Sequence, residues 1–271
     1  MLLCAGVAAA VVSKSGSTTA KPIAYEIWEL LKFGPNKAFL RYGVAEEIED
    51  EVSTIANCLL SGKRHLKILD AGCGSATHIK LESNTCLVGI DVSRDELERN
   101  VSLSERIIGD IQDCQLPAEQ YDAVVCWMVL EHLSRPQNAL KNLLRSTRIG
   151  GLLILAFPNL FSIKGIVTKL TPLWFHRLFY KRIMQYDFRP FPTYLRLEMR
   201  HKQVVRWFQS NGAVVKFEKL LEGRVSRQFR ARHKVIGLLF CVLDLSVRCM
   251  SFGRLTPLSD SCILILQRNA V

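Results

Sequence analysis

Apolar residues follow two different periods along this 271-residue chain. Between residues 44 and 60 they recur at the spacing of one helix face. Elsewhere they form short runs bounded by glycine, proline or polar residues, a pattern typical of buried strands. These runs predict seven strands, at 66–72, 86–91, 105–110, 121–129, 151–159, 213–223 and 261–268.

Helices are expected between these strands. One is predicted around 77–82, and a capping-box pattern at 93–96 opens the next. A third begins with Ser134 as its N-cap and stops at Gly150-Gly151, and a fourth covers 198–210. Strands that alternate with helices predict an α/β fold with a seven-stranded, mostly parallel sheet. The unbroken apolar strands predict that helices cover both faces.

The segment ILDAGCGSATH at residues 68–78 joins a strand to a glycine turn. Such a turn usually places a nucleotide against the backbone, although a tight turn that needs positive φ explains the same glycines. Asp70 directly precedes the turn, where its charge repels a pyrophosphate and suits a cationic group. Cys73 is interpreted as a small turn residue.

Two further acids stand at strand ends. Asp91 ends the strand after the one that carries Asp70, and its distance from Asp70 along the chain is that of a carboxylate that binds ribose hydroxyls. Asp110 ends the next strand, where it could accept a hydrogen bond from an adenine amine. Helix capping or solvation is the alternative for both. Together the three acids predict a nucleoside that carries a positively charged amino-acid tail.

Several motifs resemble those of class I S-adenosylmethionine-dependent methyltransferases, in particular the small-molecule branch called type 11, which includes the ubiquinone-pathway enzymes. They are D-A-G-C-G at 70–74, V-G-I-D at 88–91, G-D-I-Q-D at 109–113, Y-D-A-V-V at 121–125 and E-H-L at 131–133. The resemblance covers about residues 65–160 and implies a Rossmann-like fold with S-adenosylmethionine as the cofactor.

The resemblance also implies roles for single residues. The backbone at Gly72 and Gly74 would approach the methionine part of the cofactor, with Asp70 near its ammonium group. Asp91 would bind the ribose and Asp110 the adenine. Ile111, Trp127 and the backbone around Cys126 would complete the cofactor site. Ala76 replaces a frequent third glycine, and its small side chain should preserve binding.

Methyl transfer from a sulfonium is an in-line displacement, for which the protein mainly supplies alignment. A hydroxyl acceptor also benefits from a general base, and His132 is the best-placed candidate. The alternative is a histidine packed against the sheet. His176 and His201 are weaker candidates, and His78 would flank the cofactor.

Glu131-His132 also resembles the E-x-x-E-H metal site of ubiquinone-pathway O-methyltransferases. The first acid of that motif is replaced by Met128, so no metal is expected.

Charge divides the chain into two unlike parts. Residues 1–156 hold 16 lysines and arginines against 19 acidic residues, whereas residues 157–271 hold 20 against 6. The aromatic and basic stretch at about 160–197 predicts a helical lid over an acceptor site. Its aromatics could form the lid's own core, contact a lipid-like acceptor or stack on RNA bases.

The second insert, at about 223–258, joins a basic segment to an apolar helix. Its unbroken apolar run, Val235 to Leu243, is too short to span a bilayer. Asp244 and Arg248 share one face of this helix. It could lie in a membrane interface or pack on the sheet edge.

These patterns predict one methyltransferase domain at 21–271 behind a flexible leader at 1–20. Nine scattered cysteines without CxxC pairs favour a reducing compartment, hence a cytoplasmic protein with a peripheral membrane contact. The predicted reaction is O-methylation of a hydrophobic or lipid-like small molecule. The alternatives are an RNA methyltransferase, with nucleic acid as a less favoured partner, and a cofactor-binding module that transfers no methyl group and acts as a scaffold or rearrangement catalyst.

Overall fold

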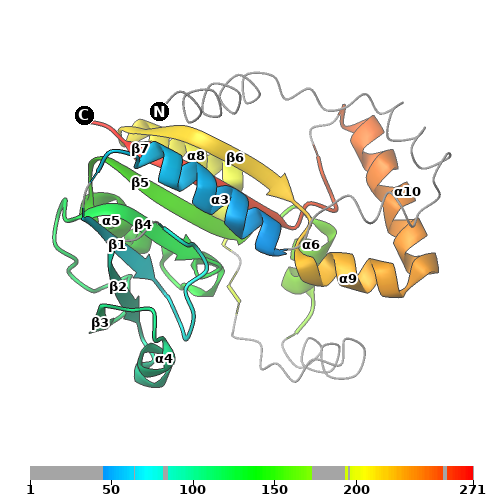
Figure 1. The fold of residues 1–271 in the computed structure, drawn as a ribbon. Coiled ribbons are helices and arrows are strands. Elements are labelled where there is room, and N and C mark those ends of the chain that lie inside the picture. The colour runs from blue at the N-terminus through cyan, green and yellow to red at the C-terminus, as the bar shows by residue number, and fades with distance from the viewer. Residues whose placement is uncertain are drawn as a thin grey trace.

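The computed structural model describes residues 45–63, 65–81, 85–172, 193–194, 196–252 and 255–270. These residues form a seven-stranded sheet in the order β3-β2-β1-β4-β5-β7-β6, which Figure 1 shows as one twisted layer. Within this sheet β7 runs antiparallel to both of its neighbours, and the other pairs are parallel. The predicted mostly parallel α/β sheet is therefore confirmed. The strands are β1 Leu66–Ala71, β2 Thr85–Asp91, β3 Glu105–Ile108, β4 Tyr121–Trp127, β5 Thr147–Pro158, β6 Ala213–Leu221 and β7 Ser261–Arg268.

Helices cover both faces of this sheet. Helix α3 lies across one face, and α5 and α8 lie across the other (Figure 1). The described helices are α3 Ala45–Leu59, α4 Arg94–Arg99, α5 Pro136–Ser146, α6 Ile163–Leu170, α8 His201–Ser210, α9 Arg224–Arg232 and α10 Lys234–Met250. Short 3-10 turns occur at Leu130–His132 and Leu197–Met199. The side chain of Ser93 accepts a hydrogen bond from the Glu96 amide, as the capping pattern predicts.

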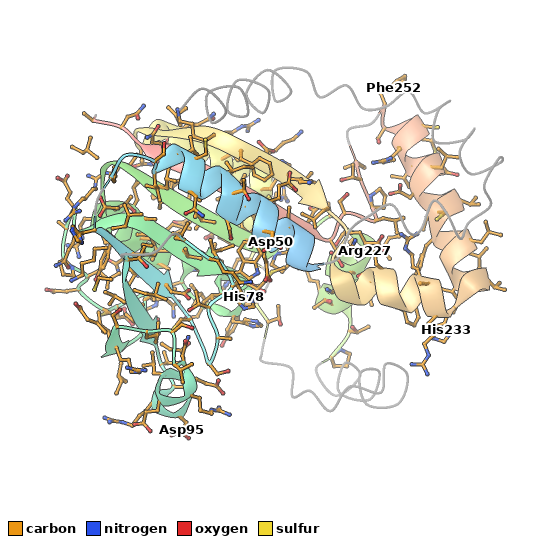
Figure 2. The ribbon with its side chains drawn as sticks, viewed as in Figure 1. Asp50, His78, Asp95, Arg227, His233 and Phe252 are labelled. Carbon is orange, nitrogen blue, oxygen red and sulfur yellow. The ribbon has the colours of Figure 1, made fainter. Side chains whose placement is uncertain are left out.

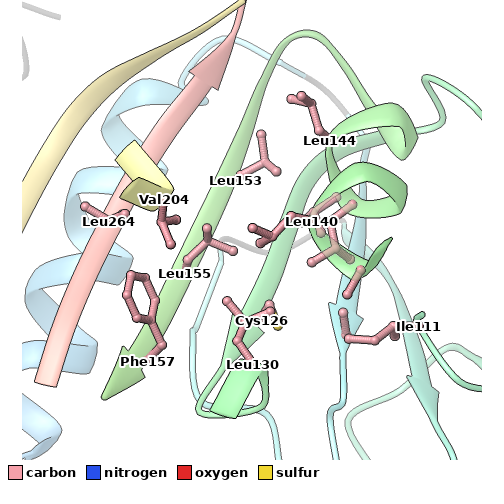
Figure 3. Close-up of a cluster of buried hydrophobic side chains, with 14 of the residues drawn as sticks. Ile111, Cys126, Leu130, Leu140, Leu144, Leu153, Leu155, Phe157, Val204 and Leu264 are labelled. Atoms are coloured by element: carbon pink, nitrogen blue, oxygen red, sulfur yellow. The ribbon is translucent and has the colours of Figure 1, made fainter. Parts of the chain in front are cut away.

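The core consists of two apolar layers separated by the sheet. Along β5, Leu153, Leu155 and Phe157 face the layer that α5 and α8 cover (Figure 3). Leu152 and Ile154 alternate with them and face α3. Because successive side chains of a strand point to opposite faces, a strand covered on both sides must be apolar throughout. The continuous apolar run of β5 is explained by this arrangement.

The helix predicted around 77–82 is wrong for the described residues 77–81, which form an irregular segment. Side chains of α3 bind both backbone groups of Lys80 instead. The Lys80 amide donates to Ser53 Oγ at 3.0 Å, and Asn57 Nδ2 donates to the Lys80 carbonyl at 3.3 Å. Ile79 is buried in the α3 layer. At Lys80, contacts with a distant helix thus satisfy the backbone groups that a local helix would have used.

Both predicted ends of α5 are also wrong. The N-cap is Arg135, while Ser134 Oγ donates to Gln112 Oε1 at 3.3 Å. The helix ends at Ser146 rather than at Gly150-Gly151, which lie within β5. Its last turn is closed because the Ser146 and Thr147 hydroxyls both donate to the Leu143 carbonyl.

Several predictions fall on residues outside the described ranges. These are the leader at 1–20, most of the lid at 160–197, and His176. The single-domain boundaries therefore stay a prediction. Among the described residues, α9 and α10 occupy the insert between β6 and β7, and no described helix has the length and apolar character needed to cross a membrane.

Candidate functional site

The carboxyl ends of β1, β2 and β4 meet at one edge of the sheet, because these strands are parallel neighbours. Asp70 lies next to the end of β1, Asp91 ends β2, and Trp127 ends β4. Asp110 follows shortly after the end of β3. The structure thus brings the predicted acids and Trp127 to the edge at which ligands of such sheets bind.

The two glycines of the turn after β1 have different surroundings. Gly72 has a φ of +73°, and a Cβ atom there would lie 2.5 Å from Val129 Cγ2. Gly74 has a φ of +52°, but a Cβ atom there would meet no atom of the protein within 4 Å. The chain's own packing therefore excludes a side chain at Gly72. Open space beside Gly74 leaves its backbone accessible to a ligand.

Gly74 is held on both sides by polar side chains. Its amide donates to Asp91 Oδ2 at 3.0 Å, and its carbonyl accepts from Asn100 Nδ2 at 3.3 Å. The other Asp91 oxygen accepts from the Ser93 amide at 2.9 Å. Asn100 is fully buried and was not predicted as a site residue, although an asparagine directly after a helix is a recognisable cap signal. Together these bonds fix the glycine turn against β2.

Asp70 is a buried acid with an unused oxygen. The residue is 4% exposed, and its Oδ2 has no hydrogen-bond partner among the described residues. Burial raises the pKa of this carboxyl to about 6, an effect that Thr77 and His78 partly offset and Asp91 adds to. A buried carboxylate of this kind is unfavourable alone and is stabilised by a cationic ligand group.

Asp110 is oriented by Gln112, a buried residue that was not predicted. Asp110 Oδ1 accepts from the Gln112 amide at 2.8 Å, and Oδ2 accepts from Gln112 Nε2 at 2.9 Å. Gln112 Oε1 in turn accepts from the Arg135 amide at 2.6 Å, which connects this loop to the start of α5. The side chain of Ile111 packs in the core (Figure 3), so any contribution to a cofactor site would come from its main chain.

Trp127 and His78 stack near the end of β4. Their ring centroids are 6.1 Å apart with an interplanar angle of 18°. His78 Nδ1 also lies 3.1 Å from Glu49 Oε1 of α3, and Figure 2 shows His78 beside this part of the helix, near Asp50. The residue after Trp127, Met128, has a φ of +54°, an uncommon conformation for a non-glycine residue. Strained positions of this kind cluster at functional sites.

His132 and Glu131 lie in the 3-10 turn that follows β4. The His132 side chain is 33% exposed, whereas that of Glu131 is 8% exposed. His132 Nε2 is 3.8 Å from Glu131 Oε1, and Glu131 Oε2 has no hydrogen-bond partner among the described residues. Burial raises the pKa of Glu131 to about 7. The sequence predicts no catalytic role for Glu131, although its position beside His132 is a signal for one.

The remaining candidates lie elsewhere or stay untested by the geometry. His201 pairs with Glu218 of β6 at 2.9 Å, on the part of the sheet that lies beyond β5. Burial raises the pKa of the Cys73 thiol to about 12, which fits a structural residue. Within the described ranges no three histidine, cysteine or acidic residues form a metal-ligand group, and the metal-free site stays a prediction.

Comparison with known proteins shows which family the residues at this edge of the sheet resemble. Residues 69–155 match the family model described as a methyltransferase domain. Residues 69–155 therefore form a class I S-adenosylmethionine-dependent methyltransferase domain. Its cofactor is S-adenosylmethionine. The matched residues run from β1 to β5 and contain the glycine turn, Asp91, Asp110 and Trp127.

Two curated relatives and one solved structure illustrate the similarity. The ubiquinone biosynthesis O-methyltransferase of Pseudomonas fluorescens is 27% identical over 175 residues, which cover 58% of this chain and 67% of that protein. The mitochondrial ubiquinone biosynthesis O-methyltransferase of Schizosaccharomyces pombe is 33% identical over 118 residues, covering 39% and 41%. Loganic acid methyltransferase with SAH shares the fold at a TM-score of 0.52 and 13% identity, covering 83% of this chain and 94% of that one.

The aligned part of this methyltransferase spans only between 41% and 67% of the curated relatives named above. A further relative, a protein of Methanocaldococcus jannaschii, is covered over 59% of its length. The family match itself covers β1 to β5, and the acceptor must be argued from this chain's own residues.

The residues of the site fit the cofactor. The unused, buried oxygen of Asp70 suits an ammonium group, and the open space at Gly74 allows a close approach to the backbone. Each Asp91 oxygen accepts one backbone amide, and a carboxylate oxygen has a second lone pair for a ribose hydroxyl. Asp110 is held in one orientation by Gln112.

Proposed function

We propose that this methyltransferase methylates an oxygen atom of a hydrophobic small molecule. The observation that carries the proposal is the pair formed by His132 and Glu131. The His132 imidazole is partly exposed and lies in the 3-10 turn that follows β4, at the edge of the sheet where the cofactor residues lie. The names of the curated relatives, ubiquinone biosynthesis O-methyltransferases, support an oxygen acceptor.

In the proposed reaction His132 removes the proton of the acceptor hydroxyl. A positioned base of this kind typically contributes about 10²–10⁴-fold to a rate. The neighbouring Glu131, 3.8 Å away, stabilises the imidazolium that forms once its own carboxyl is ionised, which its pKa of about 7 allows at and above neutral pH. When bound, S-adenosylmethionine supplies a methyl group already activated on a sulfonium. Asp70, Asp91 and the fixed Gly74 backbone then serve to orient the bound cofactor.

Exposed apolar side chains at the same edge of the sheet support a hydrophobic acceptor. Met128 and Phe161 are exposed, and they follow the carboxyl ends of β4 and β5. The Tyr194 amide donates to the Glu131 carbonyl at 2.9 Å. A described residue of the predicted lid therefore contacts the proposed catalytic turn, which supports a lid at 160–197 over the acceptor.

A label-transfer experiment tests the reaction class. The full chain is incubated with methyl-labelled S-adenosylmethionine and a cell extract, which is then separated into organic, aqueous, RNA and protein fractions. Label in the organic fraction supports the proposal. Asp91→Asn should abolish the signal, whereas Asp95→Asn, the same charge change on exposed α4, should leave it intact. Label in the RNA fraction would show that the acceptor is RNA rather than a small molecule. Cofactor binding without any labelled product would favour a module that transfers no methyl group.

A second experiment tests the base. His132→Gln should lower kcat about 10²–10⁴-fold while the Kd for the cofactor stays within about twofold. His65→Gln is the matched control, because His65 is exposed at the start of β1, on the opposite edge of the sheet. Equal rates for both variants would remove His132 from the mechanism.

A further inference from the structure

Helix α10 presents its apolar side chains to the outside of the molecule. Its most exposed apolar residues recur at positions that share one side of a helix. The other exposed residues described on this side are Ser246 and Cys249, and neither carries a charge at neutral pH. We call the following apolar set the outer face of α10: Val235, Ile236, Leu238, Leu239, Val242, Leu243 and Met250.

The charged residues Asp244 and Arg248 of α10 point the other way, into the protein. Asp244 Oδ1 accepts from the Leu258 amide at 3.1 Å, and Arg248 Nε lies 3.5 Å from Asp244 Oδ2. On the same side, Cys241 Sγ accepts from Arg230 of α9 at 3.0 Å. A surface helix in water has the reverse arrangement, with its apolar stripe toward the core and its charges outside. An exposed apolar face of this size marks an interaction site.

This orientation is fixed by buried contacts rather than by a loose tether. Arg230 makes a two-pronged ion pair with Glu222 at the end of β6, and both side chains are 7% exposed. Gly237 of α10 packs so closely on α9 that a Cβ atom would lie 2.7 Å from the Arg230 carbonyl. Asp260, directly before β7, accepts from the Gly223 amide at 2.6 Å at the start of α9. The outer face is therefore held in position relative to the sheet.

We propose that the outer face of α10 docks into the headgroup and acyl-chain boundary of an anionic lipid bilayer. The charge of the flanking sequence favours this partner. Residues 157–271 hold 20 basic against 6 acidic residues. Helix α9 contains no acid, and it holds three arginines besides Arg230, which is buried in its ion pair with Glu222. Such a surface attracts anionic lipid and repels a second copy of itself. The 17 residues of α10 extend about 25 Å, a length suited to lying in the interface plane.

The same edge of the sheet carries the methyltransferase site. Helix α6 follows the carboxyl end of β5, and α9 follows that of β6, and Figure 1 shows α6, α9 and α10 grouped beyond these strand ends. Docking through α10 would thus hold this edge near the membrane, where a hydrophobic acceptor is concentrated. The docking itself does not depend on the acceptor proposed above.

Flotation with vesicles tests the proposal on the full chain. Wild type should float with vesicles made of phosphatidylcholine and phosphatidylserine in equal parts, and less with pure phosphatidylcholine. The triple variant Val235→Ser, Leu239→Ser, Val242→Ser removes three exposed apolar side chains without touching the inward contacts. Its partition coefficient should fall at least about tenfold.

The matched control carries Val101→Ser, Ile149→Ser and Val214→Ser, three exposed apolar residues far from α10 in sequence. It should float like wild type. The proposal is wrong if wild type fails to float on anionic vesicles, or if both triple variants float equally. It is also wrong if sedimentation shows a wild-type dimer that the α10 variant converts to a monomer, since the outer face would then bind a second copy.

A spectroscopic probe separates a bilayer from the chain's own residues as the occupant. Leu239→Trp should gain a blue-shifted emission that brominated lipid quenches, only when anionic vesicles are present. A blue-shifted emission without vesicles, unaffected by brominated lipid, would show that other parts of the protein cover the face and would refute the proposal.

Discussion

Replacing Asp70 by asparagine should stabilise the methyltransferase and weaken its hold on the cofactor. The substitution preserves the shape of the side chain and removes its charge. In the cofactor-free protein this carboxyl is 4% exposed, and its Oδ2 has no partner among the described residues. Burial, the dominant cause, raises its pKa from 3.8 to about 6. The ionised form is therefore less stable in the folded protein than in the unfolded chain.

The magnitude follows from this shift. One pKa unit corresponds to about 1.4 kcal/mol, so the raised pKa of Asp70 costs about 3 kcal/mol once the group is ionised in both states. Between pH 4 and 6 the unfolded chain has already released a proton that the folded protein still holds. The free energy of unfolding of the unliganded protein should therefore fall across this window as the pH rises. Above pH 6 this contribution is constant.

Thermal unfolding at pH 5 and pH 7.5 measures this effect. At pH 7.5 Asp70→Asn should raise the free energy of unfolding by up to about 3 kcal/mol, or the Tm by about 5–10 °C. Calorimetric titration should show cofactor affinity reduced about 10- to 100-fold, because a hydrogen bond to a charged group is lost. Asp95→Asn on α4, labelled in Figure 2, is the exposed control and should change neither quantity. A variant less stable than wild type at pH 7.5 would refute the reasoning, and unchanged affinity would remove Asp70 from the cofactor site.

Two further predictions concern the glycine turn after β1 and the buried ion pair between Arg230 and Glu222. Gly72→Ala should lower the free energy of unfolding by about 2–5 kcal/mol, because the residue has a positive φ and the new Cβ atom would overlap Val129. Urea titrations measure this loss, and adding Val129→Ala should restore part of it. Gly74→Ala, with no protein atom in its way, should cost only about 1–2 kcal/mol, and equal losses at both glycines would contradict this account. Arg230→Met should cost about 3–5 kcal/mol by leaving the buried Glu222 carboxylate unpaired, and Glu222→Gln in the same chain should restore most of it. Hydrogen exchange of the α9 amides measures this loss, and unchanged protection would show that the ion pair does not hold α9.

The central strands β1, β4, β5 and β7 could be predicted from the sequence because most of their residues are buried and apolar. The run from Leu152 to Phe157 is apolar at every position since both faces of β5 are covered. The segment at 77–81 gave no comparable signal. Its conformation depends on Ser53 and Asn57 of α3, which precede it in the chain by more than the whole length of β1 and the glycine turn. A local pattern carries no information about which distant side chain will bind a backbone group.

In the site, too, residues with a local sequence signal could be predicted, and residues that depend on distant partners could not. Asp70, Asp91 and Asp110 could be predicted to meet because parallel strands end at one edge. Asn100 and Gln112 were missed because their roles depend on partners that the fold supplies, the Gly74 carbonyl and the Arg135 amide. The packing at Gly72 depends on Val129, which comes only after β4 in the chain, and no turn signal near the glycines reveals it.

For α10, the periodicity of the sequence predicts the helix and its faces but not which face points outward. The spacing predicted a helix with Asp244 and Arg248 on one side, and the structure confirms both. Periodicity alone favours the ordinary arrangement, in which the charged side meets water and the apolar side packs on the sheet. The structure has the opposite arrangement, because the Leu258 amide donates a hydrogen bond to Asp244 on the side of α10 that faces the protein. Because Asp244 and Arg248 face the protein, the apolar side of α10 must face outward. Only a partner that is itself apolar can remove that surface from water.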